Sequence, residues 1–349
     1  MRKIKIAVIG IGRKGRDHVK TLTGCFADRF ELVAVCDTDP ARTDDIEAPK
    51  KYRSLEELLR DPEVEMVVIA TRHLDHVPMA IRILESGRYC GIEKPVASSV
   101  AEMRRLQAAS EAHPGKLFLL HNRRFESEFN RVRKLLDSGM LGEVNYIKLY
   151  RSVGYCRRND WMTMPEFYGG LLTNWGPHLI DQALQLLASP VRELWADMRH
   201  CVSIGAGDDL FKIVMKGENG RVADVEVTGA NAMPGREMEV ICSRGTIVHE
   251  GDRKLKVRML DPAVPLAELK PHPENPPLSY GNFDEKLEFV EAVYGPAQVQ
   301  ESDMWKFIHD DICGVAPYPV KFGEGMEVVR ITEEVIRRTG FAPLQKFIQ

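Results

Sequence analysis

The sequence lacks the features that mark membrane, secreted or nucleic-acid-binding proteins. No apolar stretch in its 349 residues is long enough to span a bilayer. The first apolar run, Ile4–Ile9, is cut off by Gly10 and is too short for the core of a signal peptide. The formal charge of −3 provides no basic excess for nucleic acid or for an anionic membrane. We therefore expect neither nucleic acid nor a membrane as a partner.

The cysteines and histidines do not form a metal or disulfide framework. Seven cysteines are scattered along the chain without a C-x-x-C pair, which argues against a zinc ribbon and against a disulfide scaffold. His73, His76 and His121 have no cysteine or carboxylate at ligand spacing, so we predict no metal site. This cysteine usage favours a reducing compartment, and we expect a cytoplasmic protein.

The sequence does contain enough apolar residues for two cores. It is 44% apolar and 28% charged, as soluble globular proteins are, and its length exceeds what one ordinary core uses. In the first third, short runs rich in Val and Ile alternate with helical patterns, which predicts a parallel sheet covered on both faces. The predicted strands are residues 4–9, 32–36, 66–70, 89–92 and 117–120. Capping boxes begin predicted helices after Ser54 and Ser99.

After about residue 121 the pattern changes to one helix, 126–138, followed by longer alternating strands. These strands are 144–153, 210–216, 222–228, 237–242 and 246–250. Glu218-Asn219-Gly220 predicts a hairpin with a type I′ turn. A proline-rich stretch, 261–277, is typical of an exposed loop, and three helical patterns follow at 282–294, 303–313 and 323–338. We predict a second domain of α+β class with an open, mostly antiparallel sheet.

A glycine pattern follows the first predicted strand and precedes a helix. In this context it predicts a dinucleotide-binding turn and hence a Rossmann domain, an α/β unit with a doubly wound parallel sheet. Gly10 permits the tight turn, Gly12 lets the backbone approach a pyrophosphate, and Gly15 allows the helix to pack closely on the strand. The predicted cofactor-binding residues of this turn are Gly10, Ile11, Gly12, Arg13, Lys14 and Gly15. The alternative is a Rossmann-like fold with an empty or vestigial site.

Asp37 indicates which dinucleotide is bound. It ends the second predicted strand, where a carboxylate bonds the ribose hydroxyls of NAD and repels the 2′-phosphate of NADP. We therefore predict NAD, with NADP less favoured because Arg42 is near in sequence. Thr71 and His76 follow the next strand and are predicted to line the nicotinamide half of the site. The alternative for His76 is a histidine at a helix start in solvent.

Glu93-Lys94-Pro95 follows a short apolar strand, 89–92. The carboxyl ends of strands are where open α/β sheets bind ligands, so Lys94 is a candidate to contact both cofactor and substrate. Glu93 is expected to orient this turn and Pro95 to fix its backbone, with a cis Lys94–Pro95 bond as one option. The alternative is a solvated surface lysine.

Further motifs give the chain a family resemblance. Beside the glycine turn, the Val-Cys-Asp end of the second strand and Glu93-Lys94-Pro95, it contains Asn122-Arg123-Arg124-Phe125 and the stretch from Gly169 to Asp181. This ordered set resembles the Gfo/Idh/MocA family, the glucose–fructose oxidoreductase and inositol dehydrogenase type, over nearly the whole chain. The predicted division is an NAD(P)-binding Rossmann domain, 1–122, and a substrate-binding and oligomerisation domain, 123–349.

The resemblance implies an NAD(P)-dependent oxidoreductase that acts on a sugar, a polyol or a derivative. It implies Lys94 as the group that polarises the substrate and positions the cofactor, and His178 as the acid/base. Asn122 is expected to contact the cofactor and Arg124 the substrate. It also implies that the second sheet packs on another subunit, in a homodimer or homotetramer.

One position departs from the family. An aspartate often lies four residues before the histidine, and here that residue is Asn174, which can bond a hydroxyl but carries no charge. The pKa of His178 then lacks one upward push. Three accounts remain open. His178 works with Lys94 alone, another carboxylate such as Asp160 or Asp181 takes over, or the protein is not an ordinary dehydrogenase.

The segment 151–170 is the predicted specificity region. Aromatic rings stack on sugars and arginines bind carboxylates, so we list Tyr155, Arg157 and Trp161 as substrate-binding together with Lys94, Arg124, Asn174 and His178. The alternative is a solvated loop with one buried tryptophan, Trp161. If Arg157 or Arg158 faces the site, an acidic sugar becomes plausible.

Three functions follow, in order of preference. The first is an NAD-dependent oxidoreductase that transfers hydride between nicotinamide and a secondary alcohol of a small sugar-like substrate. The second is a sugar-modifying enzyme that uses NAD transiently, through oxidation, elimination or hydrolysis, and re-reduction. The third is a non-catalytic nucleotide-binding regulator.

Overall fold

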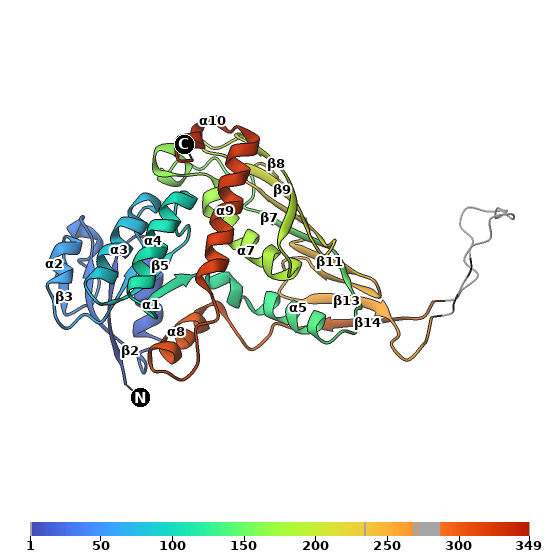
Figure 1. Ribbon diagram of the computed structural model, residues 1–349, viewed down its shortest axis with the longest axis horizontal. Coiled ribbons are helices and arrows are strands. Elements are labelled where there is room, and N and C mark those ends of the chain that lie inside the picture. Colours follow the sequence, from blue (N-terminus) through green and yellow to red (C-terminus); the bar gives the residue numbers. More distant parts are fainter. Residues whose placement is uncertain (1, 234, 267, 269, 271–286, 349) are drawn as a thin grey trace.

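A computed structural model describes residues 2–233, 235–266, 268, 270 and 287–348. Two sheets and the helices packed on them make up this part of the chain (Figure 1). Among these residues no helix is long and apolar enough to cross a bilayer.

The first sheet has six parallel strands in the order β3-β2-β1-β4-β5-β6. Its order reverses between β1 and β4, and in open α/β sheets ligands bind beside such a point, at the carboxyl ends of the strands. The strands are β1 (Ile4–Ile9), β2 (Phe30–Cys36), β3 (Lys50–Tyr52), β4 (Met66–Ile69), β5 (Tyr89–Glu93) and β6 (Leu117–Leu120). The predicted α/β Rossmann class is confirmed, and only the short edge strand β3 was missed.

Local signals set the helix boundaries of this domain. The hydroxyls of Ser54 and Ser99 accept hydrogen bonds from the N–H groups of Glu57 and Glu102, so both serine N-caps are confirmed. The full capping boxes are not formed, because the carboxylates of Glu57 and Glu102 accept the N–H groups of Arg53 and Ser98, one residue before each N-cap. Gly87 has φ +80° directly after a helix end, a conformation that favours glycine. The elements are α1 (Arg13–Thr23), η1 (Pro40–Arg42), α2 (Leu55–Leu59), η2 (His73–Asp75), α3 (His76–Glu85) and α4 (Val100–Ala112).

The second sheet has eight strands in the order β14-β13-β12-β11-β7-β10-β9-β8, and only the pair β7–β10 is parallel. Alternate residues of its strands are buried, because helices cover one face. The strands are β7 (Val144–Ser152), β8 (Val191–Arg199), β9 (Leu210–Gly217), β10 (Val222–Thr228), β11 (Met238–Cys242), β12 (Gly245–His249), β13 (Leu255–Leu260) and β14 (Phe289–Tyr294). The predicted α+β class is confirmed.

Helices α5 (Ser127–Asp137), α7 (Gly176–Leu187) and α9 (Phe322–Thr339) lie against the inner face of this sheet (Figure 1). Helix α8 (Met304–Ile312) lies instead beside the first sheet. The remaining short elements are η3 (Asn122–Phe125), η4 (Trp161–Thr163), η5 (Pro165–Phe167), α6 (Leu171–Asn174), η6 (Glu301–Asp303) and α10 (Ala342–Gln345).

Several local predictions in the second domain were wrong. Within the predicted helix 282–294, the residues 289–294 form edge strand β14, and 282–286 lie outside the described residues. Among the described residues β14 pairs with β13 alone and its side chains are mostly exposed, so it lacks the apolar alternation of a strand with one buried face. The hairpin turn is not type I′, since Gly220 has φ +85° while Asn219 is not in the left-handed region. Strands β8 and β13 were missed, and 271–277 of the predicted loop lie outside the described residues.

The two cores do not follow the chain strictly. The first core takes in Trp305, Ile308 and Tyr318 from the C-terminal part of the chain, in addition to the first sheet and its helices. Trp305 is 2% exposed and meets His18 and Phe30 edge-on, with ring centroids 5.3 and 5.6 Å apart. We propose to keep the division at residues 122 and 123 and to assign the segment 304–320 to the first core.

Trp305→Ala is expected to reduce the free energy of unfolding by about 3–5 kcal/mol, because it leaves a cavity against β2 and α1. Urea unfolding followed by circular dichroism measures this. The matched control is Val315→Ala in the same segment, which is 71% exposed and should change stability by less than about 0.5 kcal/mol. Equal effects of the two substitutions would contradict the docking of α8 on the first core.

Candidate active site

The glycine turn between β1 and α1 leaves its backbone open to a ligand at Gly12 and excludes side chains at Gly10 and Gly15. A Cβ on Gly15 would lie 1.9 Å from the Gly10 carbonyl oxygen, and Gly10 itself has φ +89°. A Cβ on Gly12 would meet nothing closer than 3.9 Å, so the backbone there is approachable. No side chain caps the N-terminus of α1, which leaves its N–H groups for a phosphate. The turn fits a dinucleotide pyrophosphate.

Asp37 is buried at the end of β2 and holds the glycine turn in place. Its Oδ2 accepts the N–H of Ile11 at 2.7 Å, and its Oδ1 accepts the N–H of Asp39 at 2.9 Å. Each carboxylate oxygen keeps a further lone pair for a ribose hydroxyl. Arg42 faces Asp39, with 3.5 Å between Nε and Oδ2.

Glu93 lies at the end of β5 and is buried among basic groups. Its Oε1 lies 2.8 Å from His18 Nε2 and 3.7 Å from Lys14 Nζ, and its Oε2 accepts the N–H of Lys94 at 3.2 Å. Burial alone would raise the pKa of this carboxyl, but Lys14, His18 and Lys94 outweigh it and hold the pKa at about 2. Glu93 therefore orients the turn as an anion. The Lys94–Pro95 peptide bond is cis.

Lys94 reaches from the first domain to the second. Its Nζ donates to the carbonyl oxygen of Asn174 at 2.6 Å and to Oδ1 of Asn174 at 2.8 Å. Loss of solvent around the ammonium lowers its pKa to about 8, with Glu93 partly offsetting the shift. The solvated surface lysine is excluded.

His178 lies in the first turn of α7 and is buried. Its Nδ1 has no hydrogen-bond partner among the described residues. Burial, followed by the nearby charges of Lys94 and Arg123, lowers the pKa of His178 well below its usual value, so the imidazole is neutral at pH 7. A neutral imidazole in this position can accept a proton.

The two carboxylates considered as substitutes for the family aspartate bind arginine side chains instead of His178. Asp181 binds the guanidinium of Arg124, and Asp160 binds Arg158 at 2.7 Å and caps the N–H of Met162 at 2.9 Å. Of the three accounts of Asn174, the geometry therefore favours His178 acting with Lys94 alone.

Arg124 is the clearest correction among the predicted site residues. It is 4% exposed; its Nε donates to Asp181 Oδ2 at 2.9 Å and its Nη1 to Glu324 Oε2 at 2.5 Å. With its donors turned to these carboxylates, Arg124 joins η3, α7 and α9 and is not available to a substrate. Its neighbour Arg123, which the sequence reasoning did not select, lies over the Trp175 ring at 4.6 Å.

Several buried polar atoms that lack a hydrogen-bond partner belong to His178 and to residues near it. Of the eight buried side-chain atoms without a hydrogen-bond partner in the described part of the chain, four belong to His121, Asn122 and His178. Asn122 Nδ2 donates to Glu301, which leaves its Oδ1 free. Buried polar groups are rarely left unsatisfied, so this cluster fits a site for a polar cofactor and substrate. His121 was missed because the sequence showed only a histidine after a strand.

Thr71 and His76, which were predicted to line the nicotinamide half of the site, contact each other. His76 is 1% exposed, which excludes the solvent alternative. Its Nδ1 lies 2.8 Å from the Pro95 carbonyl oxygen and its Nε2 3.3 Å from that of Thr71, so it joins the loops after β4 and β5. The contact of Thr71 and His76 with nicotinamide stays a prediction.

The predicted specificity region is split between solvent and the domain interface. Tyr155 is 62% exposed and Arg157 is exposed, so neither closes the site in this structure. Trp161 is half-buried and meets the His73 ring at 4.9 Å. His73 Nδ1 also lies 3.0 Å from the Tyr168 carbonyl oxygen, so the region is fastened to the first domain through His73.

Comparison with known proteins decides the family. Residues 4–121 match the model described as "Oxidoreductase family, NAD-binding Rossmann fold", and residues 129–248 match the "GFO/IDH/MocA C-terminal domain". The chain belongs to the Gfo/Idh/MocA family. The resemblance read from the motifs is thereby confirmed, and the chain is an NAD(P)-dependent dehydrogenase of alcohols with an NAD-binding domain.

Relatives of this family member are distant but cover most of the chain. The uncharacterized oxidoreductase YdgJ of Escherichia coli is 25% identical over 346 residues, which is 95% of this chain and 94% of that protein. A myo-inositol 2-dehydrogenase of Thermotoga maritima is 25% identical over 268 residues, 74% of this chain and 78% of that one. The crystal structure of an NAD-binding protein from Listeria innocua has TM-score 0.82 at 23% identity, covering 97% and 95% of the two chains.

Arg124→Ala is expected to destabilise the protein by about 3–5 kcal/mol, because it leaves Asp181 buried without a counter-charge. The double variant Arg124→Met/Asp181→Leu should recover most of this loss. Urea unfolding measures both, with Arg158→Ala in the partly exposed Arg158–Asp160 pair as a control expected to change stability by less than about 1 kcal/mol. A stable Arg124→Ala variant that had lost only substrate affinity would restore the substrate-binding role.

Proposed function

We propose that this chain transfers hydride between NAD and a secondary alcohol of a sugar, a polyol or a sugar derivative. The observation that carries the proposal is the meeting of Lys94, at the carboxyl end of β5, with Asn174 on the short helix that leads into α7 and His178. Relatives named myo-inositol 2-dehydrogenase and scyllo-inositol 2-dehydrogenase (NADP(+)) support a cyclic polyol or sugar. We keep NAD over NADP because of Asp37.

The side chains divide the chemistry of alcohol oxidation between them. NAD, held by the Gly10–Gly15 turn and Asp37, supplies the hydride acceptor. His178, neutral at pH 7, takes the hydroxyl proton, and the Lys94 ammonium donates to the oxygen on which negative charge develops. Asn174 keeps the ammonium in place without neutralising it. For the reverse reaction the proton returns from His178 to the same oxygen.

The second sheet supports an oligomer proposal. Its outer face exposes Tyr146 and Trp195, 53% and 56% exposed, on strands β7 and β8. We propose that this face joins subunits of a homodimer or homotetramer, as the family resemblance implies. A cytoplasmic location also stays a prediction.

Lys94→Ala and His178→Ala are each expected to lower kcat/KM for NAD-dependent oxidation by about 100-fold or more, because each removes a group that acts on the reacting oxygen. NADH formation with a panel of polyols and sugars measures this, and retained NADH binding shows that the fold and cofactor site are intact. Lys116→Ala is the control, at a half-buried lysine that binds the Gly87 carbonyl oxygen instead of a residue of the site. Full activity of either variant would refute the proposed roles, and product formation without NADH accumulation would favour transient use of NAD.

The pH profile of kcat/KM should fall on the alkaline side as pH rises through about 8, where Lys94 loses its proton. Asn174→Asp places a carboxylate beside the ammonium and raises the pKa of Lys94, so the alkaline limb should move to higher pH. Asn159→Asp in the exposed loop is the matched control and should leave the limb in place. An unchanged or downward-shifted limb in Asn174→Asp would show that Lys94 does not set it.

A further inference from the structure

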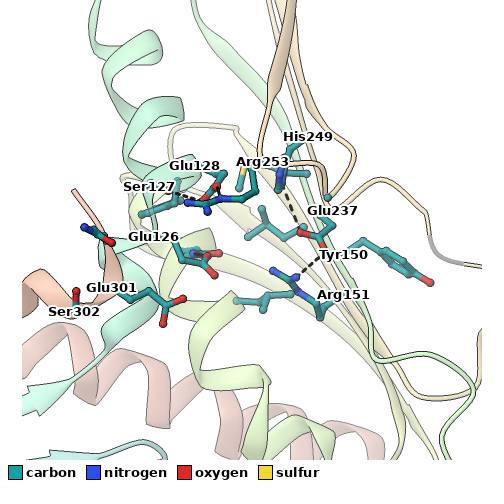
Figure 2. A pocket seen from close by; sticks show the side chains of 17 residues that line it. Glu126, Ser127, Glu128, Tyr150, Arg151, Glu237, His249, Arg253, Glu301 and Ser302 are labelled. Atoms are coloured by element: carbon teal, nitrogen blue, oxygen red, sulfur yellow. Dashed lines mark hydrogen bonds and ion pairs between the residues drawn. The ribbon is translucent and has the colours of Figure 1, made fainter. Parts of the chain in front are cut away.

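A large polar cavity adjoins the candidate active site. It has a volume of about 520 Å³ and lies between α5, α7, η6 and the inner face of strands β7, β11 and β12 (Figure 2). Cavities that bind small molecules commonly measure about 300–1,000 Å³. Leu149 and Leu179 contribute apolar surface to its wall, and polar side chains form most of the rest.

Side chains that line this cavity are one contact away from the residues around His178. Glu301 accepts the amide N–H of Asn122, and Glu126 pairs with Arg123. The guanidinium carbon of Arg151 lies 5.2 Å from the centre of the Trp175 ring, and Trp175 is the residue that precedes α7. The Trp175 ring is in turn 6.1 Å from the His178 ring. A ligand with one end at His178 would therefore have to pass Asn122, Arg123 and Trp175 to reach this cavity.

The hydrogen-bonding groups of the cavity are of both kinds. Four carboxylates, Glu126, Glu128, Glu237 and Glu301, present acceptors. On the other side, Arg151 donates from Nη1 to Glu237 at 2.7 Å while its Nε is buried without a partner in the described part of the chain. His249 Nδ1 lies 3.6 Å from Glu237, and its Nε2 is likewise unpartnered. Figure 2 shows Arg151, Glu237 and His249 grouped on the sheet side.

This mixture selects among ligand classes. An anionic group would face four carboxylates against two guanidinium groups, Arg151 and Arg253, which already pair with Glu237 and Glu128. An ammonium group can only donate, so it would leave the unpartnered Arg151 N–H unmet. Hydroxyl groups both donate and accept, and a carboxylate acceptor strengthens the bond that a hydroxyl donates. The partners offered by the wall are therefore those of a neutral, polyhydroxylated ligand.

We propose that this cavity is a subsite for a second, neutral sugar ring, so that the substrate is a disaccharide or another glycoside rather than a free monosaccharide or polyol. The inference rests on the proposed function, which places the reacting alcohol at Lys94 and His178. Glu237, His249 and Arg151 bind hydroxyls of the distal ring. Glu126 and Glu301, next to Arg123 and Asn122, lie where the two rings join.

The kinetic test uses matched pairs of sugars: glucose against maltose and cellobiose, and galactose against lactose. The parent protein should oxidise at least one disaccharide with kcat/KM at least about tenfold above that of its monosaccharide, a difference of about 1.4 kcal/mol. Glu237→Gln keeps the shape of the side chain and should remove most of that preference, with monosaccharide turnover unchanged. Glu239→Gln, two residues later on strand β11 and paired with Lys148 outside the cavity, is the control.

A binding measurement separates failure of the subsite from failure of the proposed function. Calorimetry with the NAD-loaded Lys94→Ala variant should detect the preferred disaccharide, and addition of Glu237→Gln should weaken this binding about tenfold. Absence of binding by all three disaccharides, or monosaccharide turnover that equals theirs and is untouched by Glu237→Gln, overturns the subsite alone. Disaccharide binding that Glu237→Gln weakens, together with no NADH formation by the parent from any sugar, overturns the proposed function and leaves the subsite standing.

Discussion

The two hydrogen bonds from the Lys94 ammonium to Asn174 are the contact on which the site depends. They join the carboxyl edge of the first sheet to the segment that begins α7, so one interaction sets the positions of Lys94 and His178, to which we assign the stabilisation of the reacting oxygen and the proton transfer. One further contact fixes the same interface, because His73 of the first domain meets the Tyr168 carbonyl oxygen of the second. Arg124 binds Asp181 and Glu324 within the second domain and holds η3 to α7 and α9. The domains are therefore held in register by polar groups whose loss would leave buried atoms unpaired.

The position of Lys94 also depends on Glu93, and the contacts of Glu93 reach distant parts of the chain. Its charge is maintained in a buried position by Lys14 from the cofactor turn and by His18 from α1. His18 is itself packed edge-on against Trp305 of α8, more than two hundred residues later in the sequence. Helix α8, through Trp305 and His18, thus supports Glu93, the residue beside Lys94. The packing of the segment 304–320 on the first core therefore contributes to the position of Glu93 and Lys94.

Sequence reasoning succeeded where the signal was local. The glycine turn, the caps at Ser54 and Ser99, and the buried strands of the first sheet are specified by residues a few positions apart. It failed where tertiary contacts decide. Arg123 and Arg124 are adjacent and chemically identical, and only the turn of η3 sends Arg124 to Asp181 and Arg123 to the Trp175 ring. Edge strand β14 carries a helix-like apolar spacing because it has one neighbour. The cavity is assembled from α5, three strands and η6, which no local pattern connects.

Asn174, in place of the family's aspartate, changes the pKa values of the site more than its geometry. An aspartate there would pair with Lys94 and raise the pKa of any nearby imidazole. With the amide, Lys94 keeps its hydrogen bonds but loses a counter-charge, and burial brings its pKa to about 8. Burial, followed by the nearby charge of Lys94, lowers the pKa of His178, which stays neutral. The pKa of Lys94 therefore lies above neutral pH and that of His178 lies below it. At neutral pH Lys94 is protonated and His178 is not, which is the state that alcohol oxidation requires at its start. The missing carboxylate does not by itself remove the activity, because burial and the neighbouring positive charges produce the same pair of protonation states.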